Sequence, residues 1–310
     1  KIMSGETYTW QNDVVQAGSA VIDVNTGEVV AIGAGRNRDG ERTWNYATQA
    51  RRHPGSTAKP IFDYGPGFEY SNYSTYTLFN DEPWTYTNGP EIGNWDGGYQ
   101  GLITLRQALS VSRNIPALKA FQQVDKKKIA SFVSGLGIDI AYSTKDETYQ
   151  KYSNGGDNLL NEAYSIGGMS RGVTPLDMAE AYASFANGGY HIETHAVTKI
   201  EYRSTGKTVD FTYDKEKVMS DSTAYLMNNV LQYAVEYAFN GGARVYGSTV
   251  AAKTGTSNLS DAECIAKGIP VGSVADLWTV AYTPEYSVAL WYGYEKTTKE
   301  YYLGSASAPK

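Results

Sequence analysis

The sequence contains few of the residues that build metal sites and disulfide frameworks. Its 310 residues include one cysteine, Cys264, and three histidines. A single cysteine excludes an internal disulfide and argues against a cysteine-based metal site. His191 and His195 have the i,i+4 spacing of a ligand pair, but they follow Gly188-Gly189, where a helix is expected to end. We therefore expect polar residues at a strand entry here, and neither a metal site nor another cofactor.

Positive charge and long apolar runs are also scarce. The net charge of −6 and the isoelectric point near 5.2 argue against a nucleic-acid partner, which would require a basic face. No segment approaches the roughly 20 consecutive apolar residues that cross a bilayer. The opening KIMSGETYTW lacks the charged-then-apolar pattern of a signal peptide. Because the chain begins abruptly on this segment, we expect residues 1–14 to be a linker remnant from an upstream domain.

Alternating β-branched residues near both ends of the chain predict an antiparallel sheet. Residues 19–35 predict a hairpin that turns at Asn25-Thr26-Gly27, and KIEYRS with TVDFTY predicts a second hairpin. VAAKTGTS, DLWTVAYT and EYSVALWYGYE predict three further strands. Helices are expected between these ends, most clearly over residues 174–188, where Thr174 is a natural N-cap. Helices bracketed by strands predict the α+β class, with a central antiparallel sheet assembled from both chain ends.

The middle of the chain predicts a loop followed by a broken helix. Residues 70–101 are rich in Tyr, Trp, Asn and Gly and have little periodicity, so we expect a long ordered loop that lines or covers a site. Residues 104–123 regain helical spacing, but Pro116 cannot continue a helical ladder. We expect two helices joined by a tight turn at residues 113–116. Further helices are predicted from Ser56 to near residue 65 and over residues 220–237.

The pattern S-x-x-K occurs at three places. Ser204–Lys207 lies in the turn of a predicted hairpin, where three-residue spacing does not stack side chains, and Ser307–Lys310 is the terminus. Ser56 and Lys59 instead follow Pro54-Gly55 at a predicted helix start, where both side chains lie on one face about one turn apart. Placement therefore selects Ser56 and Lys59 as the pair capable of nucleophilic chemistry.

A serine hydroxyl is a poor nucleophile unless a base removes its proton. Lysine has an ordinary pKa of about 10.4, so Lys59 can act as that base only where burial or a nearby cation lowers its pKa. Lys253, in KTGTS, is available as the cation. Pro60 has no N–H to give to the carbonyl of Ser56, which leaves the first helical turn loose. The free N–H groups of that turn can stabilise a developing oxyanion.

Two further motifs carry polar groups to predicted element ends. On a strand, Lys253 and Gly255 would face one way, and Thr254 and Thr256 the other. Gly255 removes a side chain where something approaches the backbone, which suits a substrate added along the strand edge, although an ordinary strand end is an equal alternative. Ser112-Arg113-Asn114 presents a hydroxyl and an amide at the helix break; taken alone, it would indicate an N-cap.

Taken together, the three motifs resemble the set of penicillin-binding proteins and class A β-lactamases, with Ser112-Arg113-Asn114 in place of S-D-N. YATQARRHPGSTAKP, GLITLRQALSVSRNIPAL, TPLDMAEAYASFANGG, VAAKTGTS and DLWTVAYTPEYSVALWYGYE resemble the transpeptidase domain of class A (bifunctional) penicillin-binding proteins. The resemblance implies the α+β fold shared by penicillin-binding proteins and serine β-lactamases, with helices flanking the sheet. It also implies a domain over residues 15–310 and an all-helical subdomain over roughly 66–190.

The resemblance implies D,D-transpeptidation of peptidoglycan stem peptides that end in D-Ala-D-Ala. Ser56 would be the nucleophile and Lys59 its base, Ser112 would relay a proton, and Lys253 would tune the electrostatics. β-Lactams would acylate the same serine. The protein would lie on the extracytoplasmic face of a bacterial cell membrane, and a glycosyltransferase domain would precede it in the full-length protein. The implied substrate contacts are Asn114, Thr254, Gly255, Thr256 and Asn258, and the implied oxyanion hole consists of the backbone N–H groups of Ser56 and Thr256.

Three alternatives share this nucleophile. A D,D-carboxypeptidase would use water as the acceptor, and a β-lactam-sensing domain would be acylated without turnover. A class A β-lactamase needs a Glu to activate the deacylating water; Glu162 is the nearest candidate, but it lacks the E-x-x-L-N context. The chain also departs from the family in residues 259–275, which read as an insertion containing Cys264, and in stopping at SASAPK, where a C-terminal helix is expected.

Overall fold

The computed structural model describes residues 14–37, 43–153, 155–238 and 242–304. The predicted linker, apart from Val14, and the S-x-x-K match at Ser307–Lys310 lie outside these residues. Within the described residues, no helix combines the length and the apolar character needed to span a bilayer.

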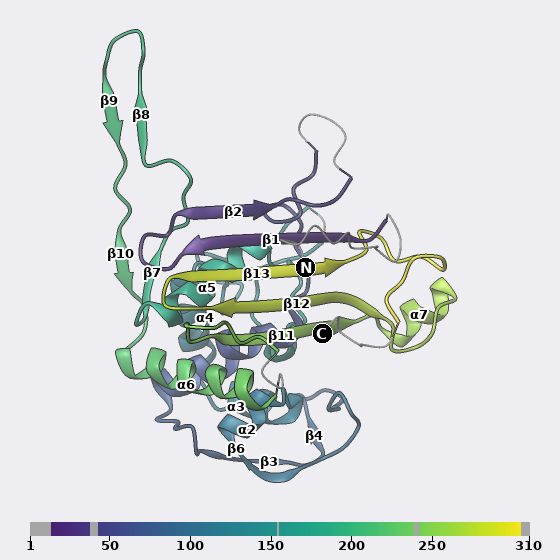
Figure 1. The fold of residues 1–310 in the computed structure, drawn as a ribbon. Helices are drawn as coiled ribbons and strands as arrows, with labels where there is room; N and C mark the ends of the chain where they lie inside the picture. Colours follow the sequence, from purple (N-terminus) through teal and green to yellow (C-terminus); the bar gives the residue numbers. More distant parts are fainter. Residues whose placement is uncertain (1–13, 38–42, 154, 239–241, 305–310) are drawn as a thin grey trace.

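A five-stranded antiparallel sheet joins the two ends of the chain, in the order β11-β12-β13-β1-β2 (Figure 1). β1 pairs with β13 along its whole length, from Gln16 opposite Gly293 to Asp23 opposite Tyr286. The first predicted hairpin and the three predicted C-terminal strands are therefore confirmed, as is the α+β class. The strands are β1 (Gln16–Asp23), β2 (Val29–Gly33), β11 (Ala251–Asn258), β12 (Val274–Tyr282) and β13 (Tyr286–Gly293).

Two predicted helices pack against this sheet. α5 (Pro175–Ala186) contacts β1, β12 and β13, and α6 (Asp221–Tyr237) contacts β11. The capping box predicted for α5 is present: the Thr174 hydroxyl accepts from the backbone N–H of Asp177, whose side chain accepts in return. Most of α5 is buried, and the Tyr182 ring packs against the ring of Tyr282 on β12.

The predicted loop at residues 70–101 is only partly irregular. β3 pairs with β6, and β4 pairs with β5. In β3, Phe79 and Asp81 point inward while the two alternate residues point outward. This four-residue alternation is too short to stand out in a polar, aromatic segment. The elements are α1 (Gly65–Tyr70), β3 (Leu78–Asp81), β4 (Trp84–Thr85), β5 (Glu91–Ile92), β6 (Gly101–Thr104) and α4 (Lys126–Gly135).

The predicted break between two helices is present, but it lies earlier than expected. α2 (Leu105–Ser110) ends before Val111, and α3 (Asn114–Gln122) already includes Pro116. A proline in the first turn of a helix is tolerated, since the N–H that it lacks would have had no intrahelical partner. The turn therefore consists of residues 111–113, and it places Ser112 between the two helices.

The helix predicted to begin at Ser56 changes its winding twice. A 3₁₀ turn η1 (Gly55–Ala58) is followed by a π-helical turn η2 (Pro60–Tyr64) and then by α1. The N–H of Lys59 donates to the Ser56 carbonyl, in place of the bond that Pro60 cannot make. The predicted end near Gly65 is wrong, because the chain continues helically to Tyr70. A Cβ on Gly65 would lie 2.5 Å from the Pro60 carbonyl oxygen, so the residue serves close packing.

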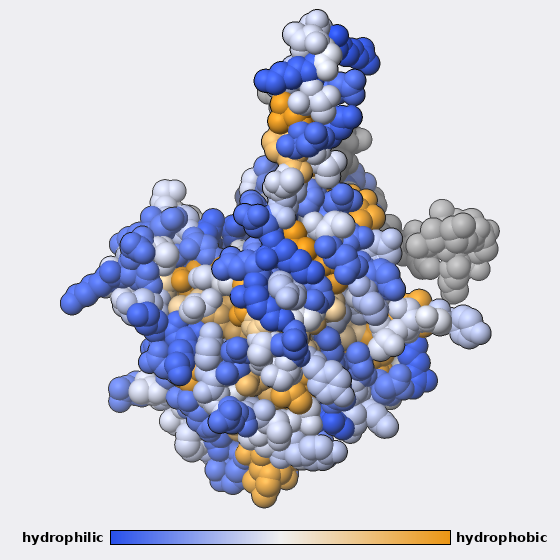
Figure 2. All heavy atoms as spheres, turned by 90° about the vertical axis from the view of Figure 1, so that its left-hand side faces the viewer, coloured by the Kyte–Doolittle hydropathy of each residue, from blue (hydrophilic) through white to orange (hydrophobic). Residues whose placement is uncertain are grey.

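An arm of two successive two-stranded sheets, β7 with β10 and β8 with β9, projects from the body (Figures 1 and 2). The second predicted hairpin is confirmed in it, and the turn that contains Ser204 and Lys207 lies at its exposed end. His191 belongs to the base of the arm, where its Nε2 lies 2.6 Å from Glu180 Oε1. The arm comprises β7 (Tyr190–Ile192), β8 (Lys199–Glu201), β9 (Thr208–Asp210) and β10 (Lys215–Lys217).

The insertion-like run at residues 259–275 contains a helix that the sequence did not predict. α7 (Asp261–Lys267) starts with a capping box between Ser260 and Glu263 and ends at Gly268 in the left-handed region. Cys264 is fully buried on it. The segment S-D-A-E carries the capping-box signature, so the helix start was readable from the sequence.

Candidate active site

The Ser56 turn packs directly on strand β11 through two glycines. Gly55 has φ +53°, and a Cβ there would lie 2.4 Å from the Thr256 carbonyl oxygen. A Cβ on Gly255 would lie 2.3 Å from the Pro54 carbonyl oxygen. The close approach predicted at Gly255 is therefore made by the protein's own Ser56 turn, and this face of the glycine is not open to a substrate.

Lys59 is fully buried beside that turn and is held by the S-x-N motif. Its Nζ donates to the Ser112 carbonyl oxygen at 2.8 Å, to Ser112 Oγ at 3.2 Å and to Asn114 Oδ1 at 2.8 Å. Burial lowers the pKa of Lys59 well below its ordinary value, and the nearby Lys253 cation lowers it further. The structure thus supplies the two conditions that a lysine base requires.

Lys253, on strand β11 of the sheet, also contacts Ser112. Its Nζ donates to Ser112 Oγ at 2.9 Å and to the Thr254 carbonyl oxygen at 2.9 Å. Burial lowers the pKa of Lys253 to about 7. Four of the predicted residues, Lys59, Ser112, Asn114 and Lys253, are therefore brought into one hydrogen-bonded cluster from three separate parts of the chain.

Ser56 itself is half-buried, one helical turn before Lys59. Among the described residues its hydroxyl takes part in no side-chain hydrogen bond. The Lys59 amine is hydrogen-bonded to Ser112 and Asn114 instead. The Ser56 hydroxyl is therefore available to react with a ligand. Candidate oxyanion donors are close: the Thr256 backbone nitrogen lies 2.8 Å from the position of a Cβ on Gly55, which makes residues 56 and 256 neighbours in space.

The remaining predicted contacts follow the expected alternation along β11. Lys253 and Gly255 are buried, whereas Thr254 and Thr256 are half-buried, as a strand with two distinct faces requires. Asn258 is exposed at the end of the strand, after a shift in register between Ser257 and Asn258. The two threonines and Asn258 therefore line one end of an edge strand.

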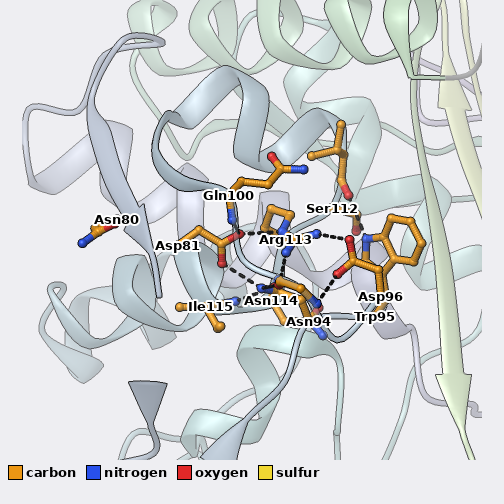
Figure 3. A network of polar contacts seen from close by, with 12 residues as sticks. Asn80, Asp81, Asn94, Trp95, Asp96, Gln100, Ser112, Arg113, Asn114 and Ile115 are labelled. Atoms are coloured by element: carbon orange, nitrogen blue, oxygen red, sulfur yellow. Dashed lines mark hydrogen bonds and ion pairs between the residues drawn. The ribbon is translucent and has the colours of Figure 1, made fainter. Parts of the chain in front are cut away.

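The sequence did not reveal a network around Arg113 (Figure 3). The guanidinium is fully buried and donates to Asp81 Oδ2 at 2.7 Å, to Asp96 Oδ2 at 2.7 Å and to the Gly98 carbonyl oxygen. Asn94 donates to Asp81 and accepts from the backbone N–H of Asn114. The available signal in the sequence was Arg113 in place of the aspartate of S-D-N. An arginine that becomes buried at such a position requires carboxylate partners.

Asp63 is a second group that the sequence did not reveal. It is completely buried four residues after Lys59, and neither carboxyl oxygen has a hydrogen-bond partner among the described residues. Burial raises the pKa of Asp63 well above its ordinary value, while the neighbouring Lys59 acts in the opposite direction. A carboxyl thus lies behind the amine, within electrostatic reach of it.

Glu162, the residue considered above as a β-lactamase base, makes its contacts away from Ser56. Its carboxylate accepts from the Thr87 backbone N–H at 2.7 Å and from Gln122 Nε2 at 3.1 Å. Neither contact involves Ser56. Within the described residues, no group of three or more His, Cys, Asp or Glu side chains is arranged to hold a metal ion.

Known proteins are similar to this chain in sequence and in fold. The family description "Penicillin binding protein transpeptidase domain" matches residues 18–310. The chain is 43% identical to penicillin-binding protein 1A/1B of Bacillus subtilis over 94% of its length, and 35% identical to penicillin-binding protein 1A of Streptococcus pneumoniae over 93%. It covers only 30% and 39% of these two proteins, which is less than half of their length.

Solved structures agree with the sequence matches. The PonA1 protein of Mycobacterium tuberculosis in complex with penicillin V superimposes with a TM-score of 0.73 at 25% identity, over 93% of this chain and 71% of that one. Penicillin-binding protein 1A of Haemophilus influenzae gives a TM-score of 0.73 over 94% of this chain and 45% of that one. At 20% identity, the latter match shows the shared fold alone.

Proposed function

The chain belongs to the transpeptidase family of penicillin-binding proteins, and we propose that Ser56 carries the acyl group in D,D-transpeptidation of peptidoglycan stem peptides. The observation that carries this proposal is the shared contact of Lys59 and Lys253 with Ser112 Oγ. Two buried amines and one hydroxyl, one helical turn from a free serine, form a proton-transfer system without a histidine.

Acylation begins when Ser56 Oγ attacks the carbonyl carbon of the penultimate D-Ala. Lys59, in its neutral form, takes the hydroxyl proton, and the backbone N–H groups of Ser56 and Thr256 stabilise the oxyanion. The C–N bond to the terminal D-Ala then breaks. Ser112 gives a proton to the leaving amine and recovers one from Lys59 or Lys253, so that D-Ala departs and an ester remains on Ser56.

The second half-reaction reverses these roles. The amine of a neighbouring stem peptide attacks the Ser56 ester, and its proton passes through Ser112 to the lysines. Lys59 returns a proton to Ser56 Oγ as the Ser56–acyl bond breaks, so that a new peptide bond joins the two stems and the serine hydroxyl is restored. Water as the acceptor would give carboxypeptidase activity with the same residues. A β-lactam would acylate Ser56 in the same way.

We assign the substrate contacts as follows. Asn114 would hold the amide of the acylated chain, Thr254 and Thr256 would bind the terminal carboxylate, and Asn258 would contact the substrate at the end of β11. The backbone of Gly255 would pair with the substrate along the free edge of β11.

The setting of the domain is also a proposal. The relatives are more than twice as long as this chain. We propose that an upstream glycosyltransferase domain precedes residue 15, and that the protein is anchored to a bacterial membrane with this domain on the extracytoplasmic side. The subdomain boundaries at residues 66 and 190 remain predictions.

Covalent labelling with a fluorescent penicillin tests the function. The wild-type chain should be labelled stoichiometrically, Ser56→Ala should not be labelled, and Ser204→Ala, which removes the serine of the arm's S-x-x-K match, should behave as the wild type. Labelling that persists in Ser56→Ala would refute the assignment. Mass spectra over time separate a stable adduct from rapid release of hydrolysed penicillin, which would indicate a β-lactamase.

A further inference from the structure

We infer that Arg113 is a positioning residue, which fixes the turn of residues 111–113 and the start of α3 to the loop of residues 93–98, so that the turn and the loop form one rigid unit (Figure 3). The inference rests on the proposed function only for its readout, which is acylation of Ser56.

The first support is the geometry of the guanidinium. The Arg113 guanidinium donates hydrogen bonds to Asp81, to Asp96 and to the Gly98 carbonyl oxygen, and its side chain is 0% exposed. A buried planar fork with two carboxylates is held in one orientation, since any rotation leaves a charge unpaired in a low-dielectric site. The arginine thus fastens β3 and the 93–98 loop to the start of α3.

The second support is the backbone strain beside it. Ser112 has φ +60°, a strained conformation that residues other than glycine rarely adopt. Such a conformation persists only where the surroundings enforce it. The bonds from Arg113 N–H to Ala108 and from Ser112 N–H to Leu109 close the turn from one side. The Arg113 side chain holds it from the other.

The third support is Asn94, which caps the catalytic helix from the loop. Arg113 is the N-cap residue of α3 but makes no side-chain cap bond. Instead, Asn94 Oδ1 accepts from the N–H of Asn114 at 2.9 Å and from the N–H of Ile115 at 3.4 Å. Asn94 Nδ2 donates to Asp81 and Gly98, the same groups that bind Arg113. The cap and the arginine are therefore one network.

The loop also determines which way the Asn114 amide faces. Its Nδ2 donates to the Gly93 carbonyl oxygen at 2.9 Å, so its Oδ1 is turned to Lys59 at 2.8 Å. Trp95, on the same loop, donates from Nε1 to the Val111 carbonyl oxygen at 3.1 Å. Displacement of the loop would release the amide and the turn together, and with them the hydrogen bonds that locate the Lys59 amine.

Charge explains why arginine occupies this position. With aspartate at position 113, as in S-D-N, the carboxylates of Asp81 and Asp96 would face a third acid instead of a cation. Asp96 is accessible enough to test without emptying the core, because its side chain is 35% exposed while Asp81 is 0% exposed. The matched control is Asp139, whose side chain is 42% exposed and pairs with Arg171 at 3.3 Å, outside the Ser56 cluster.

The experiment compares Asp96→Asn, Asp96→Glu and Asp139→Asn for thermal midpoint and for acylation by a fluorescent penicillin, resolved into non-covalent binding and the first-order acylation step. We expect Asp96→Asn to slow the acylation step about ten- to hundredfold with little change in binding or midpoint. Asp96→Glu should recover most of the rate, and Asp139→Asn should match the wild type.

The inference would be overturned if Asp96→Asn were acylated at the wild-type rate. It would also be overturned if Asp96→Asn and Asp139→Asn lost the acylation rate equally. Arg113→Lys and Arg113→Met extend the series, with a larger loss expected for Met, and the Asp96 variants decide the matter if either arginine variant fails to fold. Failure of the proposed function is a separate result, seen as labelling that does not depend on Ser56.

Discussion

Lys59 and Lys253 approach the same hydroxyl: Ser112 Oγ lies 3.2 Å from Lys59 Nζ and 2.9 Å from Lys253 Nζ. Two buried ammonium groups around one oxygen repel each other strongly, which favours a state in which one amine is neutral. That neutral amine can accept the Ser112 proton. The hydroxyl is therefore a bridge through which a proton moves between the two lysines.

Replacement of Lys59 by methionine should remove the base while preserving the volume of the buried side chain. We expect the acylation rate of Lys59→Met with a fluorescent penicillin to fall about 10²–10⁴-fold, with a retained far-UV circular dichroism spectrum. Lys207→Met, at the exposed lysine of the arm's S-x-x-K match, is the control and should acylate as the wild type. A Lys59→Met rate within about twofold of wild type would exclude Lys59 as the base.

Asp63→Asn should stabilise the protein more at high pH than at low pH. Burial raises the folded-state pKa of Asp63 above its unfolded value, so its destabilising effect is absent below the unfolded pKa and grows as the pH rises toward the folded pKa. The thermal midpoint of Asp63→Asn minus that of the wild type should therefore be larger at pH 8 than at pH 4. Exposed Asp210→Asn should show no such trend; a difference independent of pH at Asp63 would contradict the prediction.

Lys253 should make the stability rise with pH above neutrality. Its pKa falls from 10.5 in the unfolded chain to about 7 in the folded protein, so between these values the unfolded state binds more protons. This contribution to stability is lost as the pH falls toward 7. Unfolding by urea at pH 7 and pH 9 should show a smaller increase in stability for Lys253→Met than for the wild type. Equal increases would mean that Lys253 keeps an ordinary pKa.

Gly255→Ala should disturb the contact between β11 and the Ser56 turn. The added Cβ would lie 2.3 Å from the Pro54 carbonyl oxygen and 3.0 Å from Thr57, so one backbone must move. We expect a loss of about 1–3 kcal/mol in the free energy of unfolding, together with slower acylation. Gly304→Ala has open space around its Cβ and serves as the control. An unchanged acylation rate in a stable Gly255→Ala would show that the turn adapts without affecting the serine.

Several structural elements could be predicted from the sequence because each depends on residues close together in the chain. The hairpin at Asn25-Thr26-Gly27, the capping box at Thr174 and the helix break beside Ser112 each depend on a few neighbouring residues, whose propensities agree with the final fold. The resemblance in the motifs at Ser56 and Lys253 identified the family for the same reason: each motif is a short stretch with a fixed spacing.

Other features were decided only by tertiary structure. Nothing in residues 70–101 marks Asp81, Asn94 and Asp96 as partners of Arg113, because their grouping depends on how an aperiodic loop folds back over α3. The partner of Gly255 proved to be Pro54, about 200 residues earlier in the chain. A sequence pattern reports backbone preference over one or two turns, whereas burial and charge pairing depend on contacts between distant segments. The sequence by itself therefore determined the elements and the chemical groups, and packing decided which groups meet.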